Sequence, residues 1–421
     1  MNQEPVRLDP QRISRTLDDI AEIGNRFAGS PGESACREYL LGRFEELDVA
    51  ELRLEAFSYL GFERAGSSCS AQGLEGLELE SHPLQYTSGS PVNGEAVYLG
   101  AAGEEDFARI DRAGVDLAGK IVVAHAIFPF ELCDELQRRR IAGFVHICET
   151  PAPVVGNFTG ALYPPPLQPP WAGRPQPYAG VTIGDADGRA LLSAMTCGGP
   201  LRISVSHEGA YAEAVAHNLV AELPGTGDGD EHVIVSAHYD SQAEGPCVYD
   251  NGTGLAALLE CARVLGGSGV RRRIVLIASA CEEIGVWGAT AYTHAHADEL
   301  GAAAAMVNLD GLASAYPAER EIWSADATLA AMAQDTAREL GWIPDRVMNV
   351  RSTFSDHAPF GDAGVPSCLI WRPEYPYYHS RGDVRELVDA AAVAETGSVS
   401  ATLISRLARG ADVSAEPASA T

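Results

Sequence analysis

The sequence predicts an α/β fold: a mostly parallel, mixed sheet flanked by helices, with a β-rich domain inserted into the chain. From residue 213 onward, short apolar segments alternate with helical segments, which is typical of buried parallel strands joined by helices. Between residues 65 and 207, short strand-like runs alternate instead with Gly, Ser and Pro turns. Polar residues of the kinds that bind metals follow several of the apolar segments directly.

The chain opens with two predicted helices and a strand. Residues 8–25 and 32–47 repeat apolar side chains at helical spacing, and the loop between them, residues 26–32, is rich in turn formers. Residues 52–59 are predicted to form a strand. We assign residues 1–64 to the main domain.

Residues 65–207 are predicted to form the inserted domain. The proline-rich stretch 151–178 is too irregular for a core element and is predicted to be a surface flap. Within it, Asn157-Phe158-Thr159 forms a glycosylation sequon, which we interpret as accidental. The expected strands are residues 96–99, 121–124, 144–147 and 201–205, and the expected helices are residues 131–140 and 188–195.

The main domain resumes at residue 208 and continues to residue 410. The last helix is expected to cover residues 384–408, with Asp383 and Glu386 forming a capping box. The tail, residues 411–421, is predicted to be disordered. The expected strands are residues 218–222, 233–237, 274–278, 305–309 and 368–371, and the clearest helices are residues 255–265 and 327–340.

Five polar segments follow strands or open a helix in this domain. Because the carboxyl ends of strands in an open α/β sheet meet at one edge, we expect these segments to form one site. Adjacent acids after a buried strand, as in Glu282-Glu283, are costly unless a cation compensates their charge. Two histidines and three carboxylates suit zinc, and suit two ions better than one. The segments are 237–240, 249–254, 281–283, 308–311 and 377–380.

In the order of these motifs the sequence resembles the M28 family of zinc aminopeptidases and glutamate carboxypeptidases, most clearly over residues 213–383. The resemblance implies a general base at Glu282, a side chain at Asp240 that orients His238, and a donor to the oxyanion at Tyr378. It implies that Asp250 bridges two Zn²⁺ ions, for which Co²⁺ or Mn²⁺ could substitute. The implied ligands are His238, Asp250, Glu283, Asp310 and His379.

Each residue also has a simpler interpretation when it is taken alone. Asp250 could cap the helix that follows, and His238 could be a hydrogen-bonded core histidine. Asp310 could belong to an ordinary turn, and His379 could lie on a surface loop. His357 could touch substrate or simply be buried.

The inserted domain resembles the protease-associated (PA) domain of some family members, through residues 120–124 and 141–144.

Composition limits the possible partners. The formal net charge of -28 argues against nucleic acid and anionic membranes as partners. No apolar run approaches the length of a membrane span, and residues 1–23 lack the apolar stretch of a signal peptide. The nine scattered cysteines fit reduced thiols. We therefore expect a cytoplasmic enzyme; the oligomeric state cannot be read from the sequence.

The resemblance implies a dinuclear zinc hydrolase of amide bonds, an aminopeptidase or dipeptidase acting on short peptides. The first alternative keeps the zinc chemistry but acts on a modified amino acid or another small amide. Glutaminyl-cyclase-like activity and a non-catalytic binding role are further alternatives. The candidate specificity determinants are the 151–178 flap and residues 351–360 with Arg372. Arg351 or Arg372 could bind a substrate carboxylate, but each could equally pair with a surface acid.

Overall fold

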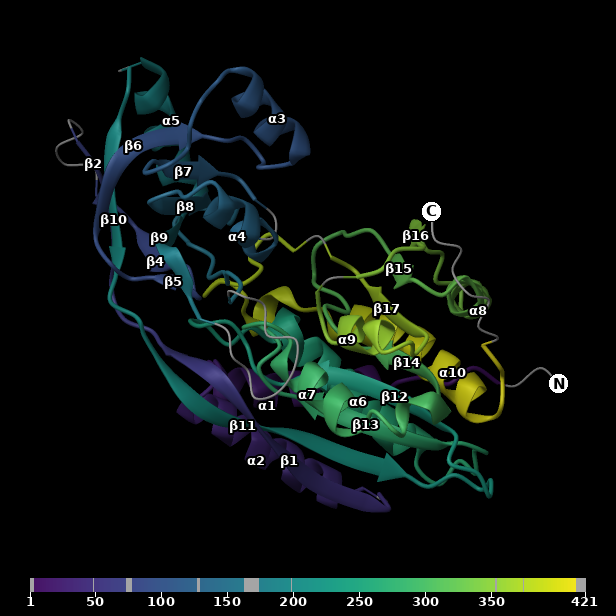
Figure 1. Ribbon diagram of the computed structural model, residues 1–421. Helices are drawn as coiled ribbons and strands as arrows, with labels where there is room; N and C mark the ends of the chain where they lie inside the picture. The colour runs from purple at the N-terminus through teal and green to yellow at the C-terminus, as the bar shows by residue number, and fades with distance from the viewer. Residues whose placement is uncertain are drawn as a thin grey trace.

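The computed structural model describes residues 4–413, except residues 48, 73–77, 127–128, 163–173, 198, 353 and 374. Most of the predicted tail, residues 414–421, and the middle of the predicted flap lie outside the described residues. Within the described residues the chain forms two sheets, each with helices packed against it (Figure 1). No helix in this part of the chain combines the length and the apolar character that crossing a membrane requires.

The first sheet has eight strands in the order β1-β11-β13-β12-β14-β17-β15-β16. Its centre, β13-β12-β14-β17, is parallel. The pairs β1-β11, β11-β13 and β15-β17 are antiparallel, and the edge strand β16 pairs parallel with β15. The predicted mixed, mostly parallel α/β class is therefore confirmed. The bounds are β1 (Glu51–Glu63), β11 (Ala210–Leu223), β12 (His232–His238), β13 (Arg273–Ser279), β14 (Ala303–Asn308), β15 (Glu321–Ser324), β16 (Arg346–Met348) and β17 (Ser367–Trp371).

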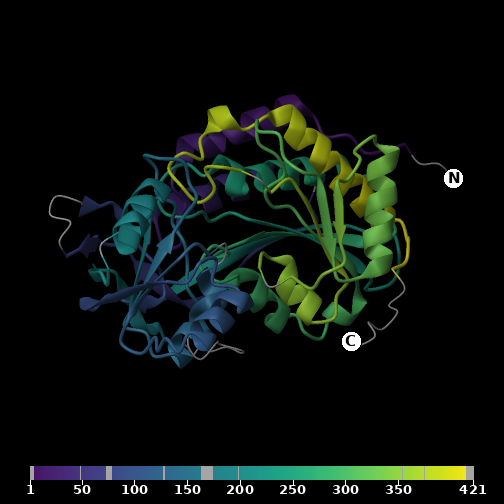
Figure 2. The ribbon, with the colours of Figure 1, turned by 90° about the horizontal axis from the view of Figure 1, so that it is seen from above.

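Helices cover both faces of this sheet. Along β13, Ile274 and Leu276 enter one core cluster and Val275 and Ile277 enter another, as strand pleating requires. Helices α1, α6 and α10 pack together on one face, where Figure 2 shows α1 beside α10, and α7 and α9 pack on the other. The bounds are α1 (Pro10–Ile23), α2 (Pro31–Glu45), α6 (Thr253–Leu265), α7 (Trp287–Ala295), α8 (Ala327–Glu339), α9 (His357–Asp362) and α10 (Ala390–Ala408).

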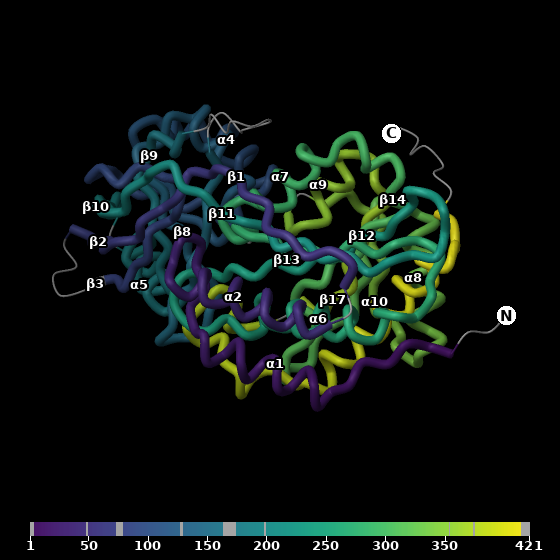
Figure 3. Tube along the Cα trace, turned by 90° about the horizontal axis from the view of Figure 1, so that it is seen from below, coloured from purple at the N-terminus to yellow at the C-terminus, as the bar shows by residue number. Residues whose placement is uncertain are grey.

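A long two-stranded ribbon connects the two sheets. β1 and β11 pair from Glu51↔Glu222 to Glu63↔Ala210, and the chain between them forms the second sheet (Figure 3). That sheet has a parallel centre, β6-β7-β8-β9, and all its strands fall within residues 67–207. Its elements are β2 (Ser67–Ala71), β3 (Glu78–Leu79), β4 (Ser81–Pro83), β5 (Thr87–Ser88), β6 (Val92–Tyr98), α3 (Glu104–Arg112), β7 (Ile121–Ala124), α4 (Pro129–Arg138), β8 (Gly143–Ile147), β9 (Gln176–Ile183), α5 (Asp185–Cys197) and β10 (Arg202–His207).

The predicted start of the last helix is wrong. Helix α10 begins at Ala390, and its N-cap is Asp389, whose side chain accepts a hydrogen bond from Ala391 N at 2.9 Å. Residues 385–387 form a separate 3₁₀ turn. Asp383 is fully buried and accepts hydrogen bonds from two backbone amides elsewhere in the chain. A tertiary contact therefore replaces the local capping box.

Arg26, in the predicted turn-rich loop, holds a loop of the main domain. Its guanidinium is fully buried and donates to the carbonyl oxygens of Tyr239 and Cys247, each at 3.0 Å, and also to those of Gly24 and Pro246. No acidic side chain is needed, because four carbonyl dipoles surround the cation. The segment that precedes Asp250 is thereby attached to the loop between α1 and α2.

We expect Arg26→Met to lower the free energy of unfolding by about 3 kcal/mol, since several buried carbonyl groups lose their donor. Urea denaturation measures the change. Arg15→Met, on the exposed face of α1, is the matched control, with an expected change of about 0.5 kcal/mol or less. Equal effects of the two substitutions would contradict the role assigned to Arg26.

Candidate active site

The candidate ligands come from five segments that meet at the carboxyl edge of the first sheet. His238 is the last residue of β12, and Asp310 follows β14 by two residues. Glu283 lies in the turn after β13, and His379 lies in the loop after β17. Asp250 lies in the irregular turn that leads into α6, where the Asp250–Asn251 peptide bond is cis. The structure thus brings all five predicted ligands together.

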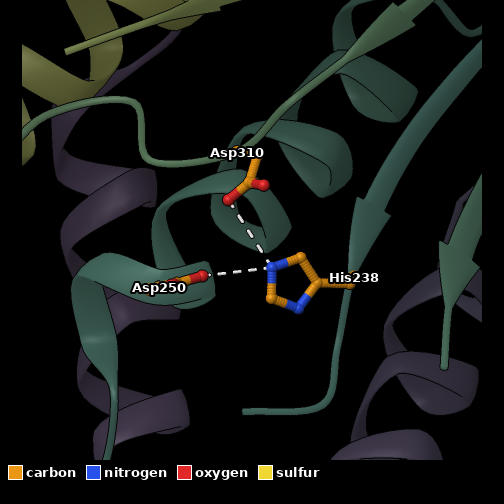
Figure 4. Close-up of side chains that lie close together, drawn as sticks. All are labelled: His238, Asp250 and Asp310. Atoms are coloured by element: carbon orange, nitrogen blue, oxygen red, sulfur yellow. Dashed lines mark ion pairs between the residues drawn. The ribbon is translucent and has the colours of Figure 1, made fainter. Parts of the chain in front are cut away.

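The ligand atoms form two triads that share Asp250. In the first, His238 Nε2 lies 3.1 Å from Asp250 Oδ1 and 3.5 Å from Asp310 Oδ1 (Figure 4). In the second, His379 Nε2 lies 3.3 Å from Asp250 Oδ2 and 3.0 Å from Glu283 Oε2. Within each triad the ligand atoms lie within 4.8 Å of one another. The two oxygens of Asp250 therefore face different triads, as a bridging carboxylate requires.

The chemistry of the donor set fits metal ions. The Nε2 atoms of His238 and His379 are buried and have no hydrogen-bond partner among the described residues. Although burial opposes it, the carboxylates of Glu283 and Asp250 raise the pKa of His379 to about 10. Such a concentration of buried negative charge is costly unless cations neutralise it. Two histidines and three carboxylates match the ligand preferences of zinc.

Asp240 holds one ligand and the two adjacent acids in place. Its two carboxylate oxygens accept hydrogen bonds from the backbone amides of Glu282, at 3.0 Å, and Glu283, at 3.2 Å. Its Oδ1 lies 3.6 Å from His238 Nδ1, and its carbonyl oxygen lies 3.2 Å from the same atom. A proton held on Nδ1 leaves the Nε2 lone pair facing the triad. Asp240 therefore supports one ligand and both adjacent acids.

Three residues that support the ligands were missed by sequence reasoning. Gln242 donates its backbone amide to Glu283 Oε1 at 2.8 Å. Ser355 donates its hydroxyl to Asp310 Oδ2 at 2.5 Å. Asp383 accepts from the backbone amide of Asp250 at 3.1 Å. Every residue except proline has a backbone amide, so the role of Gln242 cannot be predicted from its residue type. Asp383 was noticed in the sequence, but it was interpreted as part of a helix cap.

Glu282 and Glu283 both line a neighbouring pocket but differ in their other surroundings. Glu283 is 6% exposed and belongs to the second triad, whereas Glu282 is partly exposed and belongs to neither triad. Removal from bulk water, together with the Asp310 carboxylate, raises the pKa of Glu282 well above its usual range. A carboxylate with a raised pKa beside a triad suits the transfer of a water proton.

The pocket has a volume of about 300 Å³ and lies between the two sheets. The inserted domain contributes Tyr86 and residues 158–162, which include part of the predicted flap. Tyr378 also lines the pocket, and its ring stacks on His379 with centroids 3.6 Å apart. Most of the remaining lining residues are apolar: Pro129, Phe130, Ile284, Gly285, Val286, Trp287 and Phe354. Gln242 and Thr290 add polar groups.

Left-handed backbone at non-glycine residues gathers around the ligands. Cys247, Cys281, Ser355 and His379 have φ values of 44°, 58°, 59° and 58°. Each lies within three residues of a ligand or contacts one. Such conformations cost energy and persist where the surrounding contacts hold them. The site is therefore built on loops fixed by tertiary contacts.

Neither arginine proposed to bind a substrate carboxylate is available at the pocket. Arg351 pairs with Asp362 at 2.5 Å, and Arg372 pairs with Glu395. Both acids lie at the surface, which is the alternative that the sequence left open. Of the described residues that line the pocket, none is arginine or lysine.

His357 is a buried histidine rather than a pocket residue. It is 3% exposed at the start of α9, and burial lowers its pKa to about 4. Because the unfolded side chain protonates near pH 6.5 and the folded one only near 4, stability present above pH 6.5 is lost as the pH falls towards 4.

We expect His357→Leu to reduce this acid-induced loss in the metal-free protein by up to about 3 kcal/mol, because the variant has no ring to protonate. Urea denaturation at pH 7 and pH 4.5 measures the difference. Gln11→Leu, which replaces an exposed side chain that does not titrate, is the control and should leave the loss unchanged. An unaltered pH dependence in His357→Leu would contradict this account.

Histidine and carboxylate ligands at the carboxyl edge of an α/β sheet, beside a further acid, are typical of metallohydrolases. Residues 218–404 match the model of peptidase family M28. The resemblance expected from the sequence is thus confirmed.

Known relatives agree with this assignment. The chain is 30% identical to aminopeptidase YwaD of Bacillus subtilis over 186 residues, 40% of this chain and 39% of that one. It is 27% identical to carboxypeptidase Q of Xenopus laevis over 66% of this chain and 60% of the relative. These alignments span less than two thirds of either relative. The structure of an aminopeptidase from Aneurinibacillus sp. strain AM-1 superposes with a TM-score of 0.73 at 21% identity, covering 98% and 97% of the two chains, and shows the same fold.

Proposed function

We propose that the protein is a dinuclear zinc aminopeptidase that removes the first residue of short peptides. The observation that carries the proposal is the charge of the pocket beside the triads. Glu282, which belongs to neither triad, gives the pocket an acidic end, and none of its described lining residues is arginine or lysine. An acidic end favours the ammonium group of a free amino terminus over a terminal carboxylate.

The chain's own residues divide the work of hydrolysis. Two bound zinc ions would lower the pKa of a water molecule and polarise the scissile carbonyl group. Glu282 accepts the proton of the attacking water and returns it to the leaving amine. Tyr378 donates its hydroxyl to the oxygen of the tetrahedral intermediate. Asp240 keeps the Glu282 backbone and the His238 ring in place for these steps.

The apolar walls of the pocket support an uncharged side chain at the first residue of the substrate. Phe158, Ile284 and Trp287 surround the space beside Glu282 and Tyr378. A volume of about 300 Å³ is at the small end for a ligand pocket, which favours short substrates. Cobalt or manganese could replace zinc in vitro, since the ligands are imidazole and carboxylate groups.

We expect zinc-loaded protein to cleave leucyl-p-nitroanilide and Leu-Gly, and to leave N-acetyl-leucyl-p-nitroanilide intact, because acetylation removes the ammonium group. N-acetyl-Gly-Leu, whose only free terminus is a carboxylate, tests carboxypeptidase activity. Cleavage of N-acetyl-leucine alone would support the small-amide alternative instead. Rates within tenfold for free and acetylated leucyl substrates would contradict the proposed recognition of the amino terminus.

A further inference from the structure

The inserted domain contacts the main domain at the two loops that complete the second triad. His82 Nε2 lies 3.6 Å from Glu244 Oε2, and Gln85 Nε2 donates to Gln242 Oε1 at 3.3 Å. On the other loop, Arg381 donates to the carbonyl oxygen of Pro153 at 3.1 Å. The loop that holds Glu283 and the loop that carries His379 are therefore both in contact with the insert.

Asn157 connects these two loops to each other. Its backbone amide donates to the carbonyl oxygen of His379 at 2.7 Å, and its side-chain Nδ2 donates to the same oxygen at 3.3 Å. Nδ2 also donates to the carbonyl oxygen of Ala243. Ala243 adjoins Gln242, whose amide binds the Glu283 carboxylate. Asn157 is 2% exposed, so the sequon to which it belongs is not accessible for glycosylation.

Phe158 adds a second contact to the same ligand. Its ring meets the ring of His379 at an angle of 60° with centroids 5.3 Å apart. His379 has a φ of 58°, a conformation that a histidine keeps only when its surroundings fix it. The carbonyl group and the ring of His379 are thus both held by consecutive residues of the insert.

The first triad is supported differently. His238 is oriented by Asp240, and Asp310 by Ser355, which itself accepts a hydrogen bond from Asn308 at 2.6 Å. All of these residues belong to the main domain. A change at Asn157 should therefore affect the two triads unequally.

We infer that Asn157 is a positioning residue through which the inserted domain completes the Asp250–Glu283–His379 metal site. The inference rests on the proposed two-ion site and deepens it, since it makes one of the two ions depend on docking of the insert. Removing the side-chain amide frees the Ala243 carbonyl group and takes away one of the two donors to the His379 carbonyl oxygen, so the link between the two loops is lost. The imidazole and Glu283 ligands then lose their fixed separation. Loss of a group that orients a ligand typically weakens metal binding 10–100-fold.

The test is zinc competition with a chromophoric chelator, which resolves binding steps without any measurement of activity. Asn157→Ala removes the side-chain donor Nδ2, and Asn157→Asp replaces it with an acceptor of nearly the same shape; the backbone amide remains in both variants. His379→Ala and His238→Ala assign each binding step to its triad. Asn93→Ala is the matched control, because Asn93 is an exposed asparagine of the inserted domain whose side chain forms hydrogen bonds with Ser204 and Arg202.

We expect both Asn157 variants to weaken the step assigned to His379 about 10-fold or more, and to change the His238 step less than twofold. Phe158→Leu, a milder substitution in case the Asn157 variants do not fold, should weaken the same step to a smaller extent. Equal weakening of both steps, an unchanged His379 step, or a wild-type protein whose only zinc is assigned to the His238 triad would overturn the inference. Wild-type protein that binds two ions but cleaves no peptide would contradict the proposed function alone.

Discussion

Glu282→Gln should reduce kcat about 1,000-fold or more while the protein keeps its fold and its metal content. The amide has nearly the shape of the carboxylate but cannot accept the proton of the attacking water, and general-base catalysis of this kind contributes roughly 10²–10⁴-fold. Glu282 belongs to neither triad, so both ligand sets remain complete. Steady-state kinetics on leucyl-p-nitroanilide, with metal content measured on the same sample, gives the result.

Two further glutamate variants serve as comparisons for Glu282→Gln. Glu283→Gln should also inactivate the enzyme, but with loss of the ion in the second triad, because Glu283 Oε2 lies 3.0 Å from His379 Nε2. Glu339→Gln, in an exposed pair with Arg406, should change neither rate nor metal content. Residual activity above about a tenth of wild type in metal-replete Glu282→Gln would remove Glu282 from the mechanism.

Asp250→Ala should have the second large effect, the loss of both ions and of all measurable turnover. Each of its oxygens faces a different triad, so a single substitution removes a ligand from both. Asp310→Ala, by comparison, should lose only the ion of the first triad. Metal analysis after dialysis against a weak chelator distinguishes the two variants.

The alternative role of Asp250, as a helix cap, predicts a different outcome. Loss of a cap costs about 1 kcal/mol of stability and would leave the metal content unchanged. In the structure the adjacent Asn251 makes the contact of this kind, since its Oδ1 accepts from Gly254 N at 2.9 Å. Circular dichroism of Asp250→Ala should therefore show a folded protein. A variant that keeps two ions would contradict the bridging role.

The sequence predicted the parts of the structure that depend on local pattern. The run Ile121–Ala124 forms a strand with the predicted bounds, because four consecutive apolar residues fit a strand buried on both faces. The five ligands could be placed together because the carboxyl ends of strands share an edge. Residues of this kind carry their structural role in their own side-chain type and spacing.

The contacts that hold the site depend on tertiary structure and could not be predicted. Asp383 matches a capping box, yet its carboxylate serves the amides of Tyr249 and Asp250, more than 130 residues away in the chain. Gln242 acts through its backbone amide, which any residue could supply. The role of Asn157 depends on how the insert docks, and its sequence context suggested only a sequon. Local patterns do not encode such distant contacts.

The central claim is that two ions bound across Asp250 act together in peptide cleavage. Metal-free protein is titrated with zinc while the cleavage of leucyl-p-nitroanilide and the bound zinc are measured on the same samples. We expect full activity only when two zinc ions are bound per chain. Full activity at one bound ion per chain, or no cleavage of any free-amino substrate at two, would contradict it.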